Sequence, residues 1–96
     1  MSSPLLDRLT RGPLLCDGAM GTQLYAHGVS FERCFDELNL TQPDAVMRIH
    51  RAYLDAGAEM IETNTFGANR YKLKAHGLEA QVEAINTRGV AIAREA

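Results

Sequence analysis

The most regular hydrophobic pattern in the chain lies in residues 42–56. Apolar positions recur there at intervals of three and four, the spacing of a helix with one buried face: Ala45, Val46, Ile49, Ala52, Tyr53 and Ala56. Residues 41–44 (TQPD) resemble a capping box, with Thr41 as the hydroxyl N-cap and a proline in the first turn. Gly57 follows, where a left-handed cap ends a helix. The pattern predicts an amphipathic helix over 42–56.

A second long helix is predicted from residue 78 almost to the last residue, on Leu78, Val82, Ile85, Gly89 and Ile92. Residues 13–17 and 58–65 are short, apolar or partly β-branched, and bounded by turn signals, so both are predicted as strands. The remaining segments are predicted as a short leading helix at 5–9, an irregular connection at 22–40 with a helical turn at 23–26, and a loop at 66–76 with a short helix ending at Gly77.

The elements follow one another as strand, loop, helix, strand, loop and helix. This order is typical of an α/β protein whose parallel strands are joined by right-handed crossovers. A closed TIM barrel, (β/α)₈, needs eight such units and about 250 residues. The chain has 96 residues. We therefore predict the first two βα units of a TIM barrel in truncated form, and expect both sheet edges to lack partners.

Composition narrows the function classes. The chain is 46% hydrophobic and 23% charged, with a net charge of −2 and no basic run, so neither nucleic acid nor an anionic membrane is expected as a partner. Asp7, Arg8 and Arg11 interrupt any secretory leader, and no apolar stretch reaches the length of a membrane span. The expected compartment is the cytoplasm. Two cysteines form no disulfide framework and are expected to be reduced thiols.

The first candidate site is the Gly-punctuated turn at 17–22 (DGAMGT), directly after the first predicted strand. A carboxylate at the C-terminal end of a barrel strand lies where barrel active sites are built. The glycines let backbone N–H groups point at an anion. Asp17 would then hold an ammonium group and the turn a carboxylate, the two ends of an amino acid. The same residues also fit an ordinary Asp-Gly turn or a two-residue hairpin.

The second candidate site is the polar run at 62–65 (ETNT) in the second predicted strand. Polar side chains in a strand buried on both faces are costly unless they are paired. A period of two places Met60, Glu62 and Asn64 on one face. Equally, the strand is one residue shorter and residues 63–65 lie in a solvated loop. The candidate substrate-binding residues are Asp17, Gly18, Ala19, Met20, Gly21, Glu62, Thr63, Asn64 and Thr65.

The histidines and the second cysteine carry weaker signals. His27, His50 and His76 are expected at helix ends or on the surface, without a metal. Cys34 is interpreted as an exposed thiol, and no neighbour in the sequence identifies a base for it. We predict no metal site and no catalytic residue within the chain.

Taken together, four motifs resemble the opening of the homocysteine S-methyltransferase family: residues 17–22 (DGAMGT), 33–40 (RCFDELNL), 42–44 (QPD) and 56–69 (AGAEMIETNTFGAN). Their order and spacing are more specific than any one of them. The stretch from Arg33 is most similar to bacterial enzymes that fuse this barrel to a methylenetetrahydrofolate reductase. The homocysteine module of cobalamin-dependent methionine synthase is the next most similar.

The resemblance implies a methyltransferase that converts homocysteine to methionine. In the family a zinc ion binds the homocysteine sulfur as a thiolate, which matters because the free thiol has a pKa of about 8.5. The methyl donor is expected to be folate-derived, with methylcobalamin as the other option. Asp17 and the turn after it would hold the amino-acid end of homocysteine, and residues 62–65 would line the same pocket. The expected partners also include the rest of the barrel and a reductase or cobalamin module.

One departure from the family limits what carries over. The family's zinc ligands are three cysteines from later strands, one single and one adjacent pair. Neither Cys16 nor Cys34 matches a ligand position, and the chain has no Cys-Cys pair. Residues 1–96 are therefore expected to be the N-terminal fragment of a homocysteine-binding TIM-barrel domain, inactive alone and without zinc. The alternative is a non-catalytic βα module, or a piece of an unrelated TIM barrel whose Asp-Gly turn is only structural.

Overall fold

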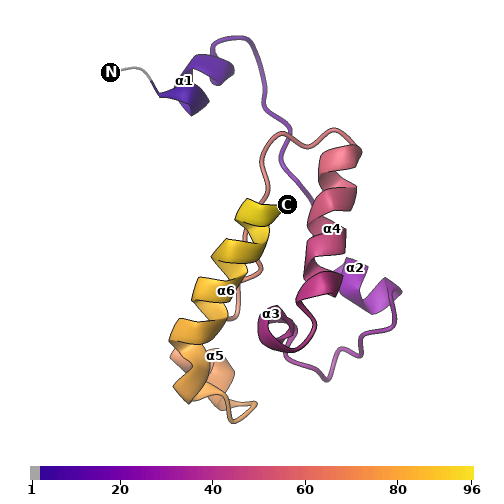
Figure 1. The fold of residues 1–96 in the computed structure, drawn as a ribbon, viewed down its shortest axis with the longest axis vertical. Coiled ribbons are helices and arrows are strands. Elements are labelled where there is room, and N and C mark those ends of the chain that lie inside the picture. Colours follow the sequence, from indigo (N-terminus) through magenta and orange to yellow (C-terminus); the bar gives the residue numbers. More distant parts are fainter. Residues whose placement is uncertain (1–2) are drawn as a thin grey trace.

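The structure is a computed structural model that describes residues 3–96, so residues 1 and 2 of the predicted 1–96 domain lie outside the described residues. The described part is elongated, with extents of 45 × 31 × 19 Å, and helical for much of its length (Figure 1). The helices, including two short 3₁₀-helices marked η, are α1 Pro4–Leu9, α2 Gly21–Ala26, η1 Phe35–Glu37, α3 Leu38–Thr41, α4 Pro43–Asp55, α5 Arg70–Lys74, η2 Glu79–Gln81 and α6 Val82–Glu95.

Helix α4 confirms the strongest hydrophobic pattern. Pro43 occupies its first turn, and Val46 and Ile49 are buried on one face. Gly57 has a φ of 114°, a left-handed conformation that glycine adopts without the steric cost of a Cβ. The predicted N-cap is wrong, because Thr41 is the last residue of α3 and its hydroxyl donates to the carbonyl of Glu37. Gln42 is the N-cap and makes no side-chain cap hydrogen bond.

The predicted second long helix is confirmed as η2 followed by α6, with Ile85, Gly89 and Ile92 buried. The connection predicted as irregular over 22–40 is more ordered than expected. It contains most of α2, all of η1 and most of α3, because Leu24 and Leu38 bury their side chains completely against α4. Tertiary burial stabilises these short helices, which are too short to persist alone in water.

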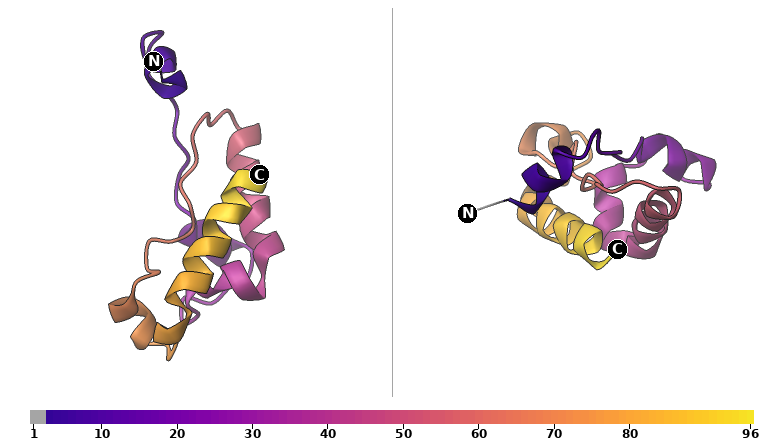
Figure 2. Two further views of the ribbon diagram at one scale, coloured as in Figure 1. Left: turned by 60° about the vertical axis from the view of Figure 1, so that its left-hand side comes forward. Right: turned by 90° about the horizontal axis from the view of Figure 1, so that it is seen from above.

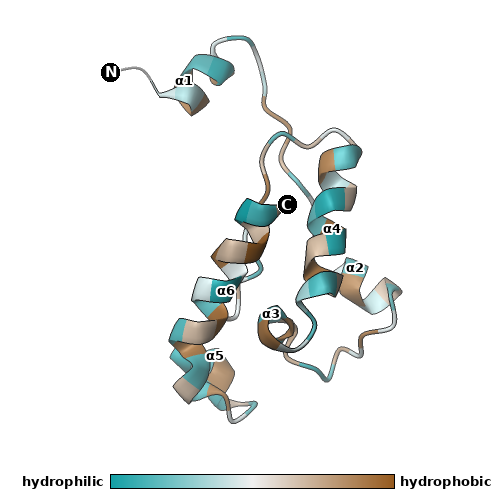
Figure 3. Ribbon diagram, viewed as in Figure 1, coloured by the Kyte–Doolittle hydropathy of each residue, from teal (hydrophilic) through white to brown (hydrophobic). Residues whose placement is uncertain are grey.

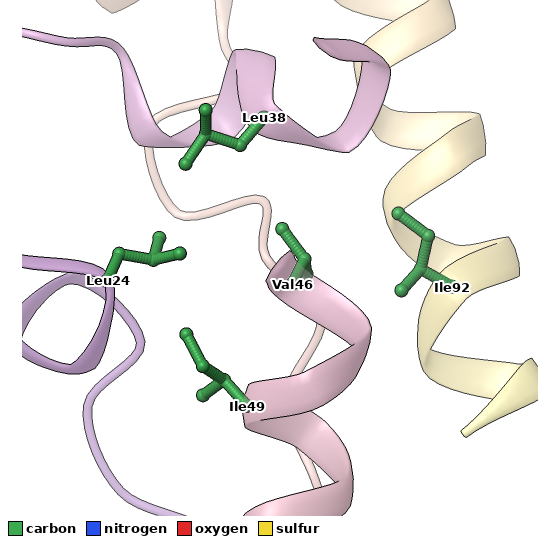
Figure 4. Packing of buried hydrophobic residues seen from close by; sticks show 5 residues of the cluster. All are labelled: Leu24, Leu38, Val46, Ile49 and Ile92. Atoms are coloured by element: carbon green, nitrogen blue, oxygen red, sulfur yellow. The ribbon is translucent and has the colours of Figure 1, made fainter. Parts of the chain in front are cut away.

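The main hydrophobic core lies between α4 and α6. Figure 4 shows its buried side chains from α2, α3, α4 and α6: Leu24, Leu38, Val46, Ile49 and Ile92. A second cluster contains Cys34, Ala68, Leu73 and Ile85. Cys34 is therefore buried, and its interpretation as an exposed thiol is wrong. In Figure 3 hydrophobic residues recur along α4 and α6 between hydrophilic ones, as expected for helices with one buried face.

The two predicted strands, 13–17 and 58–65, are the largest difference between prediction and structure. Within residues 3–96 they are reduced to one isolated bridge between Cys16 and Met60. The bridge is parallel, as predicted, and the two extended segments run side by side (Figure 2). The N–H of Asp17 donates to the carbonyl of Met60 at 3.0 Å. Within the described part of the chain a regular ladder is missing, because each segment pairs there with the other alone, and isolated pairs of strands are marginal in water.

Two apolar side chains of this pair are left exposed to solvent. Leu15 is 57% exposed and Met60 is 41% exposed.

Helix α1 lies apart from the helical body (Figure 1). It is attached through Arg8, whose guanidinium donates to the Glu59 carboxylate at 2.7 Å from Nε to Oε2. Among residues 3–96, no helix combines the length and the apolar character needed to cross a bilayer.

Candidate functional site

The turn after Cys16 and the polar run after Met60 meet at one end of the parallel pair. The backbone N–H of Glu62 donates to Oδ2 of Asp17 at 3.1 Å. Asp17 is half-buried, whereas Gly18 and Ala19 are exposed. The bridge between Cys16 and Met60 brings the turn and the polar run together, because it aligns the two segments in parallel just before their polar residues begin.

A cavity of about 310 Å³ lies between the two segments. Its lining consists of Asp17, Gly18, Ala19, Met20, Glu62, Thr63, Asn64 and Phe66. Of the nine residues predicted from the sequence, only Gly21 and Thr65 are absent from this lining. Phe66 was missed, although it continues the polar run directly and is 92% exposed.

The polar run does not alternate as a strand would. Asn64 is buried, and its amide donates to the Phe35 carbonyl at 2.9 Å and to Oδ1 of Asn39 at 3.0 Å. The hydroxyls of Thr63 and Thr65 are 2.7 Å apart, which the predicted period of two would also allow. Residues 63–65 lie in a loop, as the alternative reading had it, but buried Asn64 means that this loop is not simply solvated.

The buried side chain of Asn39 on α3 holds this loop in place. Its amide nitrogen donates to the carbonyl of Asn64 at 2.8 Å and to that of Ile85 at 3.1 Å. Buried polar groups cost free energy unless they are paired, and here the amide pairs with two carbonyls. Gly89 on α6 leaves the space for it, because a Cβ there would lie 2.8 Å from Nδ2 of Asn39. Sequence reasoning found Gly89 only as part of the apolar stripe and missed Asn39.

A second cavity, of about 420 Å³, adjoins the first and shares Met20, Asn64 and Phe66 with it. Its other lining residues are Gly21, Arg33, Cys34, Phe35, Asp36, Gly67, Lys72 and His76. The Gly67 N–H donates to Oδ1 of Asp36 at 3.2 Å, and burial raises the pKa of that carboxyl. The Lys72 ammonium lies over the Phe66 ring, 5.4 Å from its centroid.

Cys16, Asp17 and Glu62 form a group that sequence reasoning missed. The Cys16 thiol lies 3.4 Å from Oδ1 of Asp17 and 3.6 Å from Oε1 of Glu62. Ligand atoms of all three residues lie within 4.8 Å of one another. Desolvation, the hydrogen bond to Asp17 and the nearby carboxylate charges raise the pKa of the Cys16 thiol.

This group does not fit a resident zinc ion. Zinc is bound by cysteine as the thiolate, and the environment of Cys16 favours the protonated thiol as donor to the two carboxylates. Oδ2 of Asp17 is also engaged by the N–H of Glu62. We assign no metal to these three residues.

His50 on α4 departs from its prediction. It is fully buried, and within residues 3–96 neither ring nitrogen has a hydrogen-bond partner. The predicted surface role is therefore wrong for His50, while His27 and His76 are exposed as predicted. Burial lowers the pKa of His50, and the charge of Asp17 opposes this in part. Its ring is thus neutral at pH 7, because its ordinary pKa is about 6.5.

Tyr53 on α4 also contacts the site. Its hydroxyl donates to the carbonyl of Ala19 at 2.8 Å. The sequence pattern placed Tyr53 on the apolar stripe only. The sequence could have suggested a contact of this kind, because a partly buried tyrosine needs a partner for its hydroxyl.

The chemistry of the first cavity suits a small zwitterion. Two carboxylates, Asp17 and Glu62, stand on one side and favour a cationic group such as an ammonium. The turn offers backbone N–H groups, since within residues 3–96 those of Gly18 and Ala19 donate to no protein acceptor. Backbone N–H groups of this kind bind anions such as a carboxylate.

Comparison with known proteins places the chain in a protein family. The model of the homocysteine S-methyltransferase family matches residues 14–96. The chain belongs to the homocysteine S-methyltransferase family, a family of methyltransferases. This membership confirms the resemblance seen in the four motifs and does not favour a non-catalytic module or an unrelated barrel.

Individual relatives agree with this placement. The chain is 42% identical to the methionine synthase of Mycobacterium tuberculosis (strain ATCC 25618 / H37Rv) and 40% identical to that of Mycobacterium leprae (strain TN), in each case over 94% of this chain and 8% of the relative. The crystal structure of the homocysteine methyltransferase MmuM from Escherichia coli, in its metallated form, matches with a TM-score of 0.82 and 30% identity. That match covers 97% of this chain and 34% of MmuM. The chain thus spans a small part of each relative's length.

Proposed function

We propose that residues 1–96 are the N-terminal part of a homocysteine-binding TIM barrel, and that the cavity between residues 17–20 and 62–66 holds the amino-acid end of homocysteine. The observation that carries the proposal is the meeting of Asp17 and Glu62 at the end of a parallel pair, in a chain of this family. Active sites of such barrels lie at the C-terminal ends of the strands.

The proposed binding mode uses both halves of the site. The substrate ammonium pairs with the carboxylates of Asp17 and Glu62, and the substrate carboxylate accepts hydrogen bonds from the N–H groups of Gly18 and Ala19. Met20, Thr63 and Asn64 line the pocket around the substrate, and Gly21 and Thr65 adjoin it in the sequence. Asn64 acts mainly as a support, since its amide is held by Phe35 and Asn39.

Exposed apolar side chains beside the site support the barrel part of the proposal: Leu15, Met60 and Phe66. In a closed barrel, neighbouring units cover the apolar side chains that an isolated pair of segments leaves open. We propose that further βα units cover these side chains, in line with the match to 34% of the MmuM chain.

The reaction we propose for the whole enzyme is transfer of a methyl group, folate-derived or carried by methylcobalamin, to the homocysteine sulfur to give methionine. Zinc, which the resemblance implies, would be held by cysteines outside this chain, because Cys16 and its neighbours do not fit it. In this reaction, residues 1–96 bind and orient the substrate. A reductase or cobalamin module in the same protein is part of the proposal, as is a cytoplasmic location.

The test uses the protein translated from the complete reading frame that contains residues 1–96. Formation of the methyl thioether is measured with homocysteine, which gives methionine, and with 4-mercaptobutanoic acid, which lacks the amino group and gives 4-(methylthio)butanoic acid, using methyltetrahydrofolate and then methylcobalamin as donors. We expect homocysteine to be used at least about tenfold more efficiently, since loss of a charge-assisted contact costs at least 1.4 kcal/mol. Equal use of the two thiols would contradict the binding mode, and no methionine with either donor would contradict the function.

A further inference from the structure

Tyr53 contacts the turn half of the site without lining the cavity. Its hydroxyl donates to the Ala19 carbonyl at 2.8 Å, in the turn that follows Asp17. The lining of the cavity of about 310 Å³ does not include Tyr53. Its backbone carbonyl accepts the N–H of Ala58 at 3.0 Å, a bond at the end of α4 that lies outside the site. The side chain of Tyr53 therefore supports the turn from outside the cavity.

The ring of Tyr53 also fills the space beside Gly18. A Cβ at position 18 would lie 2.9 Å from the Tyr53 hydroxyl oxygen, and 3.1 and 3.2 Å from two ring carbons. Cβ contacts under 3.0 Å require something to shift, so this approach is possible only with glycine at 18. The hydroxyl thus donates to Ala19 and is also the atom nearest to position 18, and the ring carbons lie close to the same turn.

The turn itself has few other restraints. Gly18 and Ala19 are exposed, and within residues 3–96 their N–H groups donate to no protein acceptor. By contrast, α4 is firmly placed, because Val46 and Ile49 on it are in the main core. A rigid helix that holds a loosely restrained turn can set the turn's conformation before a substrate arrives, which lowers the entropic cost of binding.

We propose that Tyr53 is a positioning residue for substrate binding, which sets the Gly18–Ala19 backbone through its hydroxyl and ring. The inference rests on the proposed function and deepens it by naming what orders the pocket. Tyr53 does not touch the substrate and takes no part in methyl transfer. Its loss therefore raises the KM for homocysteine and leaves kcat nearly unchanged.

The experiment uses the protein from the complete reading frame with Tyr53→Phe, which removes the hydroxyl and keeps the ring. We expect the KM for homocysteine to rise about 3- to 10-fold, the range of one neutral hydrogen bond, with kcat within about twofold of the parent. The matched control is Tyr71→Phe on α5, an 84% exposed tyrosine outside both cavities, which should leave both constants unchanged. An unchanged KM in Tyr53→Phe would overturn the proposal.

A double-mutant cycle separates positioning from a general loss of structure. Gly18→Ala should raise the KM strongly, because its new methyl group meets the Tyr53 hydroxyl. In the Tyr53→Phe background the nearest atom is gone while the ring carbons at 3.1 and 3.2 Å remain, so the further effect of Gly18→Ala should be smaller but not abolished, as coupled neighbours are not additive. Strictly additive effects on KM would contradict a contact between Tyr53 and position 18.

A readout without substrate keeps this inference distinct from the proposed function. In protein labelled with ¹⁵N glycine and alanine, backbone order parameters report the rigidity of Gly18 and Ala19 on the ps–ns timescale. Tyr53→Phe should lower both, while Tyr71→Phe should not. If homocysteine proves not to be a substrate, the proposed function fails, and the order parameters alone decide whether Tyr53 holds the turn. Unchanged order parameters in Tyr53→Phe would overturn the positioning role.

Discussion

Glu62 donates its backbone N–H to the Asp17 carboxylate, at 3.1 Å between N and Oδ2, across 45 positions of sequence. The bond links the end of the first extended segment to the polar run of the second. It leaves Oδ1 of Asp17 with the Cys16 thiol as its neighbour, at 3.4 Å. Within residues 3–96, the Asp17 carboxylate is thus held in the cavity lining by a backbone N–H and forms no ion pair.

The first prediction concerns these carboxylates in the protein from the complete reading frame. Asp17→Asn keeps an oxygen for the Glu62 N–H and removes the charge, so the fold should survive while homocysteine binding weakens. We expect kcat/KM for homocysteine to fall about 10- to 100-fold, since hydrogen bonds to charged groups are worth about 1.5–3 kcal/mol. Glu62→Gln should act in the same direction. Metal content, measured by elemental analysis, should stay at the parent level in both variants.

The control for this prediction is Glu59→Gln. Glu59 is a nearby carboxylate whose partner is Arg8, and it lines neither cavity of the site. Its neutralisation should leave kcat/KM within about twofold of the parent, since exposed ion pairs contribute little. Parent-like kinetics in Asp17→Asn would mean that Asp17 is a structural turn residue.

The second prediction concerns Gly89 on α6. In an ordinary helix interior, Gly→Ala stabilises by about 1 kcal/mol. Here the new Cβ would lie 2.8 Å from both Nδ2 of Asn39 and Cγ2 of Thr65, and overpacking of this kind costs about 1–3 kcal/mol. Gly89→Ala should therefore lower the free energy of unfolding, measured by urea denaturation. The exposed Thr87→Ala on the same helix should be neutral or slightly stabilising, and a stabilised Gly89→Ala would contradict the contact.

The third prediction concerns pH. Burial lowers the folded-state pKa of His50 below its usual 6.5, so the unfolded chain binds a proton more readily than the folded protein. The stability that neutral His50 confers is present above pH 6.5 and is lost as the pH falls below that value. NMR titration of the imidazole Cε1 proton should give His50 a pKa below the ordinary value of about 6.5. His50→Gln should weaken the acid-side loss of stability and the exposed His27→Gln should not; a His50 pKa at or above the ordinary value would refute the assignment.

The fourth prediction concerns zinc binding by residues 1–96 alone. The thiol of Cys16 has a raised pKa and hydrogen bonds to two carboxylates, so it is poorly prepared to bind a metal. After dialysis against zinc, elemental analysis should find no stoichiometric zinc. A tight one-to-one site that disappears in Cys16→Ser would show that the group of Cys16, Asp17 and Glu62 is a metal site.

The sequence by itself determined the two long helices and the family. The period of Val46 and Ile49 predicted α4, and Gly57 marked its end, because both depend on local backbone geometry and on which side chains avoid water. The four motifs identified the family because they occur in a fixed order. The parallel direction of the bridge between Cys16 and Met60 also followed from the order of the elements.

Only the tertiary structure decided how the site is supported. Asn39 lies in a segment that was predicted as irregular, and His50 and Tyr53 lie on α4. The Asn39 amide nitrogen donates to two carbonyls, the His50 ring has no hydrogen-bond partner among residues 3–96, and Tyr53 donates to the Ala19 carbonyl. These relationships join residues 25 to 46 positions apart, and no local period encodes which distant group a side chain will meet. The strands were overpredicted for a related reason: a ladder depends on neighbouring strands, and the propensity of one segment does not supply them.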